Sequence, residues 1–166
     1  MGELIIVSNR LKFRKTDAED LDFVLDAENA GENRLFINQW SREKHVSALE
    51  DSNVLHMVIC DVDNKRVGYN ILIGINNPSG ELTMQRFVIT EKGKGYGREA
   101  LGLIKKIAFE KLGMHRLQLQ VREYNERAKK LYKSEGFVEE GIMRESAFVD
   151  GAFKSSIMMS LLEQEY

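Results

Sequence analysis

Three alternating glycines in the hexapeptide Lys92–Gly97 (KGKGYG) follow a strand-like apolar run and open a long amphipathic pattern. Glycine lacks a Cβ, so the backbone can turn tightly there and bring its amide groups close to a ligand. At the first turn of a helix, unpaired N–H donors and the helix dipole favour a negative charge. Lys92, Lys94 and Arg98 add positive charge at the same place. The chain therefore predicts a strand–turn–helix unit whose turn binds an anion.

The spacing of the glycines separates several kinds of glycine-rich loop. A Walker A loop ends in Gly-Lys-Ser/Thr so that the hydroxyl can hold magnesium, but here Lys94 is followed by Gly95. A dinucleotide-binding G-x-G-x-x-G motif that starts at Gly93 would place Arg98 at its third glycine, and it lies past the middle of the chain. A flexible loop rich in glycine and lysine is the remaining alternative on these residues alone.

Composition limits the class of protein. The 166 residues, 43% of them hydrophobic, predict one domain that spans residues 1–166 with a real core. A formal charge of −2 argues against a general nucleic-acid-binding protein, which needs a basic face. Cys60 is the single cysteine, so no internal disulfide can form. The histidines at 45, 56 and 115 are scattered and lack a cysteine partner, so we expect no metal site.

The N-terminal segment Met1–Val7 is too short and too acidic at its start for a signal peptide. No apolar run approaches the length that a membrane-spanning helix requires. We therefore expect a cytoplasmic protein with no membrane partner.

The hydrophobic periodicity predicts a single α/β domain around a mixed sheet. The predicted strands are Leu11–Lys15, Val54–Cys60, Arg66–Ile75, Leu82–Ile89, Leu117–Val121, Phe137–Ala147 and Ala152–Leu161. Helices are predicted after the cap at Thr16 or Asp17, over 42–50, from the glycine loop to Gly113, and over 125–135. Val46 and Leu49 would form the inner face of the second helix. The last two strands would be joined by an Asp150-Gly151 hairpin turn.

A second motif lies in Tyr124–Phe137 (YNERAKKLYKSEGF). Asn125 stands where a helix N-cap belongs, and Ala128, Leu131 and Tyr132 recur at helical spacing. Asn125 and Tyr132 are about two helical turns apart, so both can face one cleft. The alternative is that Asn125 only caps the helix and that Tyr132 is an ordinary core aromatic.

The two motifs together resemble motifs A and B of the GNAT superfamily of N-acetyltransferases. The glycine loop matches Arg/Gln-x-x-Gly-x-Gly/Ala with Lys92 in the first position, and the second segment matches N-x-x-A-x-x-L-Y-x-x-x-G-F. The resemblance covers roughly Leu82–Leu161. The tail, with Glu140–Glu145 and Asp150-Gly151, is similar to the branch that contains bacterial ribosomal-protein N-terminal acetyltransferases and spermidine acetyltransferases. The connection from Ile89 to Lys92 is shorter than is usual there.

The resemblance implies an α/β (α+β) fold. Its mixed central sheet would have about six to seven strands and about four flanking helices. The sheet would be splayed between the fourth and fifth predicted strands, Leu82–Ile89 and Leu117–Val121, so that a thioester can enter it.

The resemblance also implies an acetyl-CoA-dependent N-acetyltransferase that moves the acetyl group directly onto a primary amine in a ternary complex. The amine would belong to a protein N-terminus, a polyamine or another small molecule. The loop amides would hold the pyrophosphate, and the backbone edge at 87–89 would pair with the pantetheine arm. A backbone N–H near Val88 or Ile89 would stabilise the developing oxyanion. The residues implied in acetyl-CoA binding are Phe87, Val88, Ile89, Lys92, Gly93, Lys94, Gly95, Tyr96, Gly97, Arg98, Asn125, Ala128 and Tyr132.

Catalytic roles follow from the same resemblance. Tyr132 would donate a proton to the departing thiolate, and Asn125 would hold the cofactor or a water molecule. Glu81, at the start of the central strand, is the candidate general base, with a water chain as the alternative. The acceptor pocket is expected around Asn33–Trp40 and the last hairpin turn, with Trp40 in a packing role.

Two other functions fit parts of the sequence. A CoA-binding regulatory or interaction domain would keep the loop but lack turnover. A nucleotide-binding protein would use the same loop for ATP or NAD. The final hairpin also offers an edge through which a homodimer can form.

Overall fold

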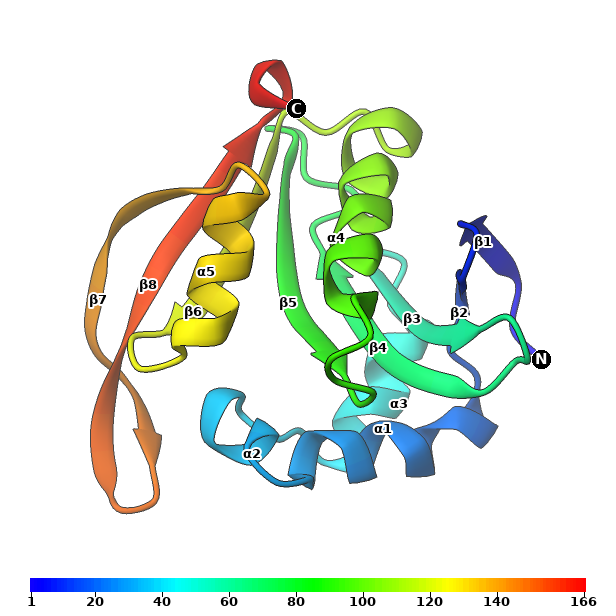
Figure 1. The fold of residues 1–166 in the computed structure, drawn as a ribbon, viewed down its shortest axis with the longest axis horizontal. Helices are drawn as coiled ribbons and strands as arrows, with labels where there is room; N and C mark the ends of the chain where they lie inside the picture. The colour runs from blue at the N-terminus through cyan, green and yellow to red at the C-terminus, as the bar shows by residue number, and fades with distance from the viewer.

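The computed structural model describes residues 1–166 and contains an eight-stranded mixed sheet with helices on both faces (Figure 1). The strands are β1 (Leu4–Val7), β2 (Leu11–Lys15), β3 (Val54–Asp61), β4 (Arg66–Ile73), β5 (Glu81–Ile89), β6 (Arg116–Arg122), β7 (Val138–Val149) and β8 (Ala152–Leu162). The α-helices are α1 (Leu21–Asn29), α2 (Asn33–Phe36), α3 (Arg42–Glu50), α4 (Tyr96–Lys106) and α5 (Glu126–Ser134). Short helical segments are η1 (Ala18–Asp20), η2 (Ile107–Lys111, a π-helix) and η3 (Glu163–Glu165).

The strand order is β1-β2-β3-β4-β5-β6-β8-β7. All neighbouring strands are antiparallel except β5 and β6, which are parallel and are joined through α4. A parallel pair needs such a crossover, and it covers one face of the sheet. The predicted α/β class, the mixed sheet and the strand–loop–helix–strand unit are confirmed.

The parallel pair is short. Only Glu81, Leu82 and Thr83 of β5 have partners in β6, where they pair with Arg116, Leu117 and Gln118. Both strands continue beyond this point, and Figure 1 shows them diverging toward the glycine loop. The predicted splay between these strands is therefore confirmed.

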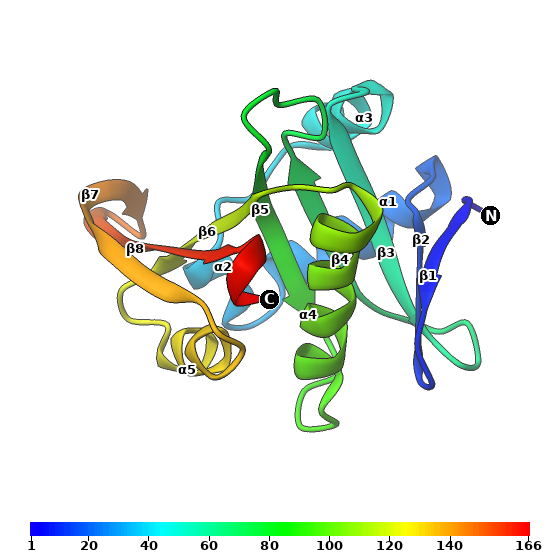
Figure 2. The same ribbon diagram turned by 90° about the horizontal axis from the view of Figure 1, so that it is seen from above.

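Each face of the sheet has its own core. Figure 2 shows α4 and α5 on one face, where Leu101 and Ile104 of α4 pack with Leu117 and Leu119 of β6 in the larger cluster. On the other face, Val24 and Ala27 of α1 pack in a smaller cluster with strand residues that include Tyr69. The apolar spacing in α4 explains its position, because residues three and four apart share one face.

Several local expectations needed correction. The short strand β1 and the single-turn helix α2 were not predicted. The inner face of α3 was also wrong, because Val46 is 40% exposed and the structure buries His45 and Ala48 instead. His45 turns inward because its Nε2 lies 2.9 Å from the buried carboxylate of Glu28 in α1. A polar pair between two helices therefore outweighs the hydrophobicity of Val46.

The last hairpin has the predicted turn. Asp150 and Gly151 have φ angles of 48° and 81°, as a two-residue turn with left-handed residues requires. Strand β7 lies at the edge of the sheet and leaves Ile142 exposed, and Phe153 of β8 is exposed as well. A homodimer through this hairpin stays a prediction. None of the helices has the length and hydropathy needed to cross a bilayer.

A buried ion pair ties β2, η1 and β4 together. Both Asp20 oxygens accept hydrogen bonds from Arg14 at 2.7 Å, and Arg66 Nε donates another at 2.7 Å. Burial by itself would raise the pKa of Asp20, but these hydrogen bonds hold that pKa well below its usual range. The carboxylate therefore contributes to stability at neutral pH, and this contribution decreases as the pH falls below about 4.

We expect Asp20→Asn to lower the free energy of unfolding by about 3–5 kcal/mol, because it leaves the Arg14 guanidinium buried without its counter-charge. The matched control is Asp22→Asn, since the Asp22 side chain is 84% exposed in its pair with Arg42; its effect should stay within about 0.5 kcal/mol. Urea unfolding at pH 7 measures both changes. Equal effects of the two substitutions would contradict the assignment, and the difference should shrink in acid.

Candidate functional site

A cavity of about 470 Å³ opens where β5 and β6 separate. The glycine loop and the first turns of α4 and α5 line one part of it, and α2 with Ile37 lines another. The strands contribute residues 84–89 of β5 and 119–122 of β6. Because the opening crosses the sheet, groups that arrive from opposite faces can meet inside it.

Most residues that the sequence motifs singled out line this cavity. They are Phe87, Val88, Ile89, Lys92, Gly93, Gly95, Tyr96, Gly97, Arg98, Asn125, Ala128 and Tyr132. Lys94 and Glu81 do not line it. The structure thus brings the two motifs to one place, while the role of each residue stays a prediction.

Glu81 lies apart from the other candidates. It stands in the paired part of β5, where its carboxylate accepts hydrogen bonds from Arg116 Nε at 3.0 Å and from Gln118 Nε2 at 3.1 Å. An extended strand places it roughly 25 Å from Ile89 at the other end of β5. An ion pair with Arg116 thus holds Glu81 at the closed end of the strand pair, outside the cavity, and its role as the general base stays a prediction.

The glycine loop has the backbone that its sequence suggested. Gly93 and Gly95 have φ angles of 80° and 76°, a conformation that residues with a Cβ rarely adopt. Gly95 is the N-cap of α4 and supplies no side chain to the first-turn amides. A Cβ added at Gly93 would meet no atom within 4 Å, so open space lies beside the loop. The loop therefore presents free N–H donors to the cavity.

Two of the three cations predicted at the loop already have counter-charges. Lys94 Nζ lies 3.1 Å from Glu91, and Arg98 pairs with Glu135, the residue that follows α5. These ion pairs hold the loop and the two helix ends together. They do not leave free charge for a ligand.

Lys92 differs from the other two. Its Nζ contacts Asn33 Oδ1 at 3.4 Å, and burial together with the charge of Arg127 lowers its pKa. Arg127 also lines the cavity and makes no ion pair. The positive charges of Lys92 and Arg127 repel each other, and no anion of the protein lies between them. A negatively charged ligand group would fit at this place. The sequence reasoning missed Arg127, although it lies inside the second motif, on the first turn of α5 between Asn125 and Ala128.

The second motif places a tyrosine inside the opening. Asn125 Oδ1 accepts a hydrogen bond from the Ala128 amide at 3.3 Å, so it is the N-cap of α5. Tyr132 is 8% exposed, lines the cavity and packs its ring 5.8 Å from that of Phe137. Burial raises the pKa of Tyr132. The phenol therefore stays protonated at neutral pH and can donate a hydrogen bond or a proton.

A β-bulge in β5 changes which side chains face each side of the sheet. Ile71 and Leu72 of β4 pair with Arg86 and Met84, so Gln85 is the extra residue. Met84 belongs to the core under α4, whereas Val88 belongs to the cluster under α1. The bulge thus turns Arg86 toward the side of α1. Beyond Thr83, the edge of β5 that faces β6 has no strand partner.

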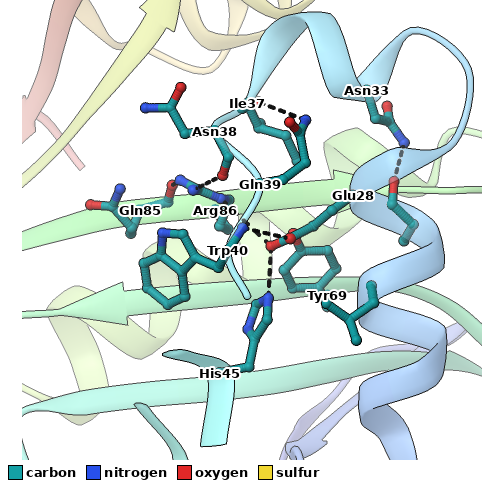
Figure 3. Close-up of polar contacts among 12 residues, drawn as sticks. Glu28, Asn33, Ile37, Asn38, Gln39, Trp40, His45, Tyr69, Gln85 and Arg86 are labelled. Carbon is teal, nitrogen blue, oxygen red and sulfur yellow. Dashed lines mark hydrogen bonds and ion pairs between the residues drawn. The ribbon is translucent and has the colours of Figure 1, made fainter. Parts of the chain in front are cut away.

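The sequence reasoning also missed two buried arginines in the cavity wall. Arg86 is 5% exposed and Arg122 is 8% exposed. The main-chain oxygen of Asn38 accepts a hydrogen bond from Arg86, and its Oδ1 accepts one from Arg122 Nη2 at 2.9 Å. Figure 3 shows Asn38 above Arg86, in the segment that follows α2. A charged residue in the middle of an apolar strand was the available signal for Arg86.

Glu28 lies fully buried behind Arg86 (Figure 3). Its carboxylate accepts hydrogen bonds from the Trp40 amide at 3.1 Å and from the Tyr69 hydroxyl at 2.8 Å, and it contacts His45. Burial by itself would raise the pKa of Glu28, but these contacts hold that pKa below its usual range. The network fixes the segment that carries Asn38, and Trp40 packs over the Arg86 guanidinium, 5.1 Å from it.

The chain is similar to known proteins over nearly its whole length. It is 27% identical to spermidine N(1)-acetyltransferase of Vibrio cholerae over 171 residues, which cover 96% of this chain and 97% of the relative. The corresponding enzyme of Escherichia coli K12 is 26% identical over 169 residues, covering 96% and 89%. The crystal structure of the Vibrio cholerae enzyme in complex with CoA and spermine is 25% identical, with a TM-score of 0.83 and coverage of 96% and 99%.

A family model supports the same assignment. The model described as acetyltransferase (GNAT) domain matches residues 10–138, which include the glycine loop, the opening between β5 and β6, and Tyr132. The chain therefore belongs to the GNAT family and is an acetyl-CoA-dependent N-acetyltransferase.

Proposed function

We propose that acetyl transfer to a primary amine takes place in the opening between β5 and β6, within one ternary complex. The observation that carries this proposal is the convergence of the glycine loop, the unpaired edge of β5 and Tyr132 on a single cavity. Acetyl-CoA supplies a thioester whose carbonyl carbon accepts the amine. We further propose one catalytic domain over residues 1–166, a cytoplasmic location and a homodimer.

The residues at the loop fit the phosphates of the co-substrate. The free amides at 92–98 would bind the pyrophosphate, with help from the α4 dipole. Lys92 and Arg127 have no carboxylate partner within ion-pair distance, so phosphate charge would relieve their mutual repulsion. The unpaired β5 edge at 87–89 would bind the amide-rich pantetheine arm as an added strand.

The chemistry needs one proton donor and one proton acceptor. The amine lone pair forms the C–N bond while the C–S bond breaks and leaves its electron pair on sulfur. Tyr132 gives its proton to that sulfur and is reprotonated from solvent. A backbone N–H at 87–89 opposes the charge that develops on the carbonyl oxygen. The amine nitrogen loses its proton to water, because Glu81 lies outside the cavity.

The relatives and the tail motifs suggest two classes of acceptor. The relatives are named for spermidine, and the tail motifs are also similar to ribosomal-protein N-terminal acetyltransferases. Both classes present a primary amine, and the steps above apply equally to them. The charges of the cavity wall decide between these acceptors.

We expect Tyr132→Phe to lower kcat by about 10²-fold or more, because a positioned general acid contributes about 10²–10⁴-fold. The affinity for CoA should change less than threefold, roughly, because the ring remains in place. Tyr166→Phe, at a tyrosine that bonds Glu110 near the C-terminus, is the matched control. Thiol release measures turnover, and calorimetry measures binding. Wild-type turnover in Tyr132→Phe would leave Tyr132 as a packing residue.

The raised pKa of Tyr132 predicts the pH profile. A donor whose pKa is raised stays protonated as the pH increases, whereas an alkylamine acceptor becomes reactive only as it loses its proton. We therefore expect kcat/KM for the acceptor to rise with pH and to show no alkaline decrease below about pH 10. A decrease near pH 7 to 8 would identify a different proton donor.

The loop is tested by a pair of glycine substitutions. Gly95→Ala should cost about 1–2 kcal/mol of stability, since φ is 76° there. It should also weaken CoA binding about tenfold or more, because a residue with a Cβ disfavours the left-handed conformation that orients the loop amides. Gly102→Ala lies within α4 beside open space, so it should raise stability by up to about 1 kcal/mol without changing CoA affinity. If Gly95→Ala kept wild-type affinity, the loop would not hold the phosphates.

A further inference from the structure

We propose that Arg86 and Arg122, which Asn38 orients, form a subsite for a carboxylate on the acceptor, so that the preferred acceptor is an amine that also carries a carboxylate. The inference rests on the proposed function, because it describes the acceptor side of the same cavity. It assigns this chain a substrate class different from the purely cationic polyamines for which the relatives are named.

The two arginines leave part of their hydrogen-bonding capacity unused. A guanidinium has five N–H donors. Arg122 uses Nη1 on Ser156 Oγ at 2.8 Å and Nη2 on Asn38 Oδ1 at 2.9 Å. Arg86 donates to the main-chain oxygens of Gln85 and Asn38. Both Nε atoms are buried without a partner. Buried donors are costly to leave unpaired. Every acceptor that the two guanidinium groups contact through their other nitrogens is neutral.

The charges around the two arginines are not balanced within the protein. Arg122 has no carboxylate partner, and the nearest one to Arg86 is Glu28 at 3.9 Å. One buried carboxylate therefore faces two buried guanidinium groups. His56 adds no charge, because burial and the neighbouring His45 lower its pKa to about 3. The cluster keeps a net positive charge, which an incoming anion would balance.

The acidic residues in the cavity offer little free charge to a polyamine, which would need carboxylates to receive its ammonium groups. Two of the three carboxylates in the cavity wall have cations of their own, because Glu91 pairs with Lys94 and Glu126 pairs with Lys129. Only Glu32 makes no ion pair. A polycation in this cavity would meet Arg86 and Arg122 without compensation, and like charges of this kind disfavour the wrong ligand.

The subsite is separate from the phosphate-binding loop. Asn38, which contacts both arginines, follows α2, and the bulge turns Arg86 toward α1. The phosphates would lie at the N-terminal ends of α4 and α5, on the other face of the sheet. Guanidinium groups bind planar carboxylates through paired hydrogen bonds, which favours a carboxylate as the group that they receive.

The test uses matched acceptors that differ in one carboxylate. The rate of thiol release from acetyl-CoA is measured with the full chain and each acceptor. Ornithine is compared with 1,4-diaminobutane, and lysine is compared with 1,5-diaminopentane. Spermidine, an Asp-initiated peptide and its Asn-initiated counterpart complete the set. We expect kcat/KM to be about tenfold or more higher for the members with a carboxylate, since tenfold corresponds to one charge-assisted contact. The free amino acids and the peptides distinguish a carboxylate on a small molecule from a carboxylate on the first residue of a polypeptide.

Variants connect that preference to the subsite. Arg122→Gln should reduce the ornithine-to-diamine ratio about tenfold while CoA affinity stays unchanged, and Arg122→Lys should retain part of the ratio. Arg42→Gln, at an exposed arginine paired with Asp22, is the control that should leave the ratio unchanged. If Arg122→Gln is unstable, calorimetry of ornithine and 1,4-diaminobutane with the wild-type CoA complex measures the same preference.

The outcomes separate the two proposals. Higher kcat/KM for spermidine or the diamines than for their carboxylate partners would overturn the subsite but keep the transferase proposal. An equal loss for both kinds of acceptor in Arg122→Gln would also overturn it and leave Arg122 as a positioning residue. Absence of turnover with every amine, despite CoA binding, would instead contradict the proposed function.

Discussion

The early end of pairing between β5 and β6 is the constraint on which the rest of the structure depends. After Thr83 and Gln118 the two strands have no mutual hydrogen bonds, although both continue. Unpaired backbone groups inside a sheet are unfavourable unless something else satisfies them. An added strand of ligand would do so, and the cavity lies at that place. The same divergence brings the first turns of α4 and α5 to one opening, with Tyr132 inside it.

Ion pairs hold the two sides of the opening in place. Arg98 of α4 pairs with Glu135, the residue that follows α5, and Lys105 reaches the same carboxylate at 2.9 Å. On the other face, the Glu28 network fixes the segment that carries Asn38. These charges are satisfied within the protein. In the cavity wall, Lys92, Arg122 and Arg127 make no such pair, and a ligand can reach their charges. The unpaired cations of the cavity are therefore available to an anionic ligand.

Local sequence patterns predicted the fold well and the acceptor side of the site poorly. The glycine spacing identified a loop whose φ angles need glycine, and the helical spacing placed Asn125 and Tyr132 at one cavity. The position of Glu81 outside the cavity was not predicted, because a strand pattern does not show where pairing ends or which neighbour, here Arg116, contacts the carboxylate. Arg86 was missed because one extra residue in β5 reverses the alternation of faces. His45 was missed because its partner Glu28 belongs to another helix.

By itself, the sequence determined most of the helices and strands, the glycine turn and the family, because these depend on residues close together in the chain. Backbone conformation and helix periodicity are local properties. Only the tertiary structure decided how far β5 and β6 pair, which cations keep a free charge, and where Arg86, Arg122 and Asn38 meet. Those features depend on residues up to 84 positions apart. Their charges and hydrogen bonds are balanced in space, and no local pattern in the chain records that balance.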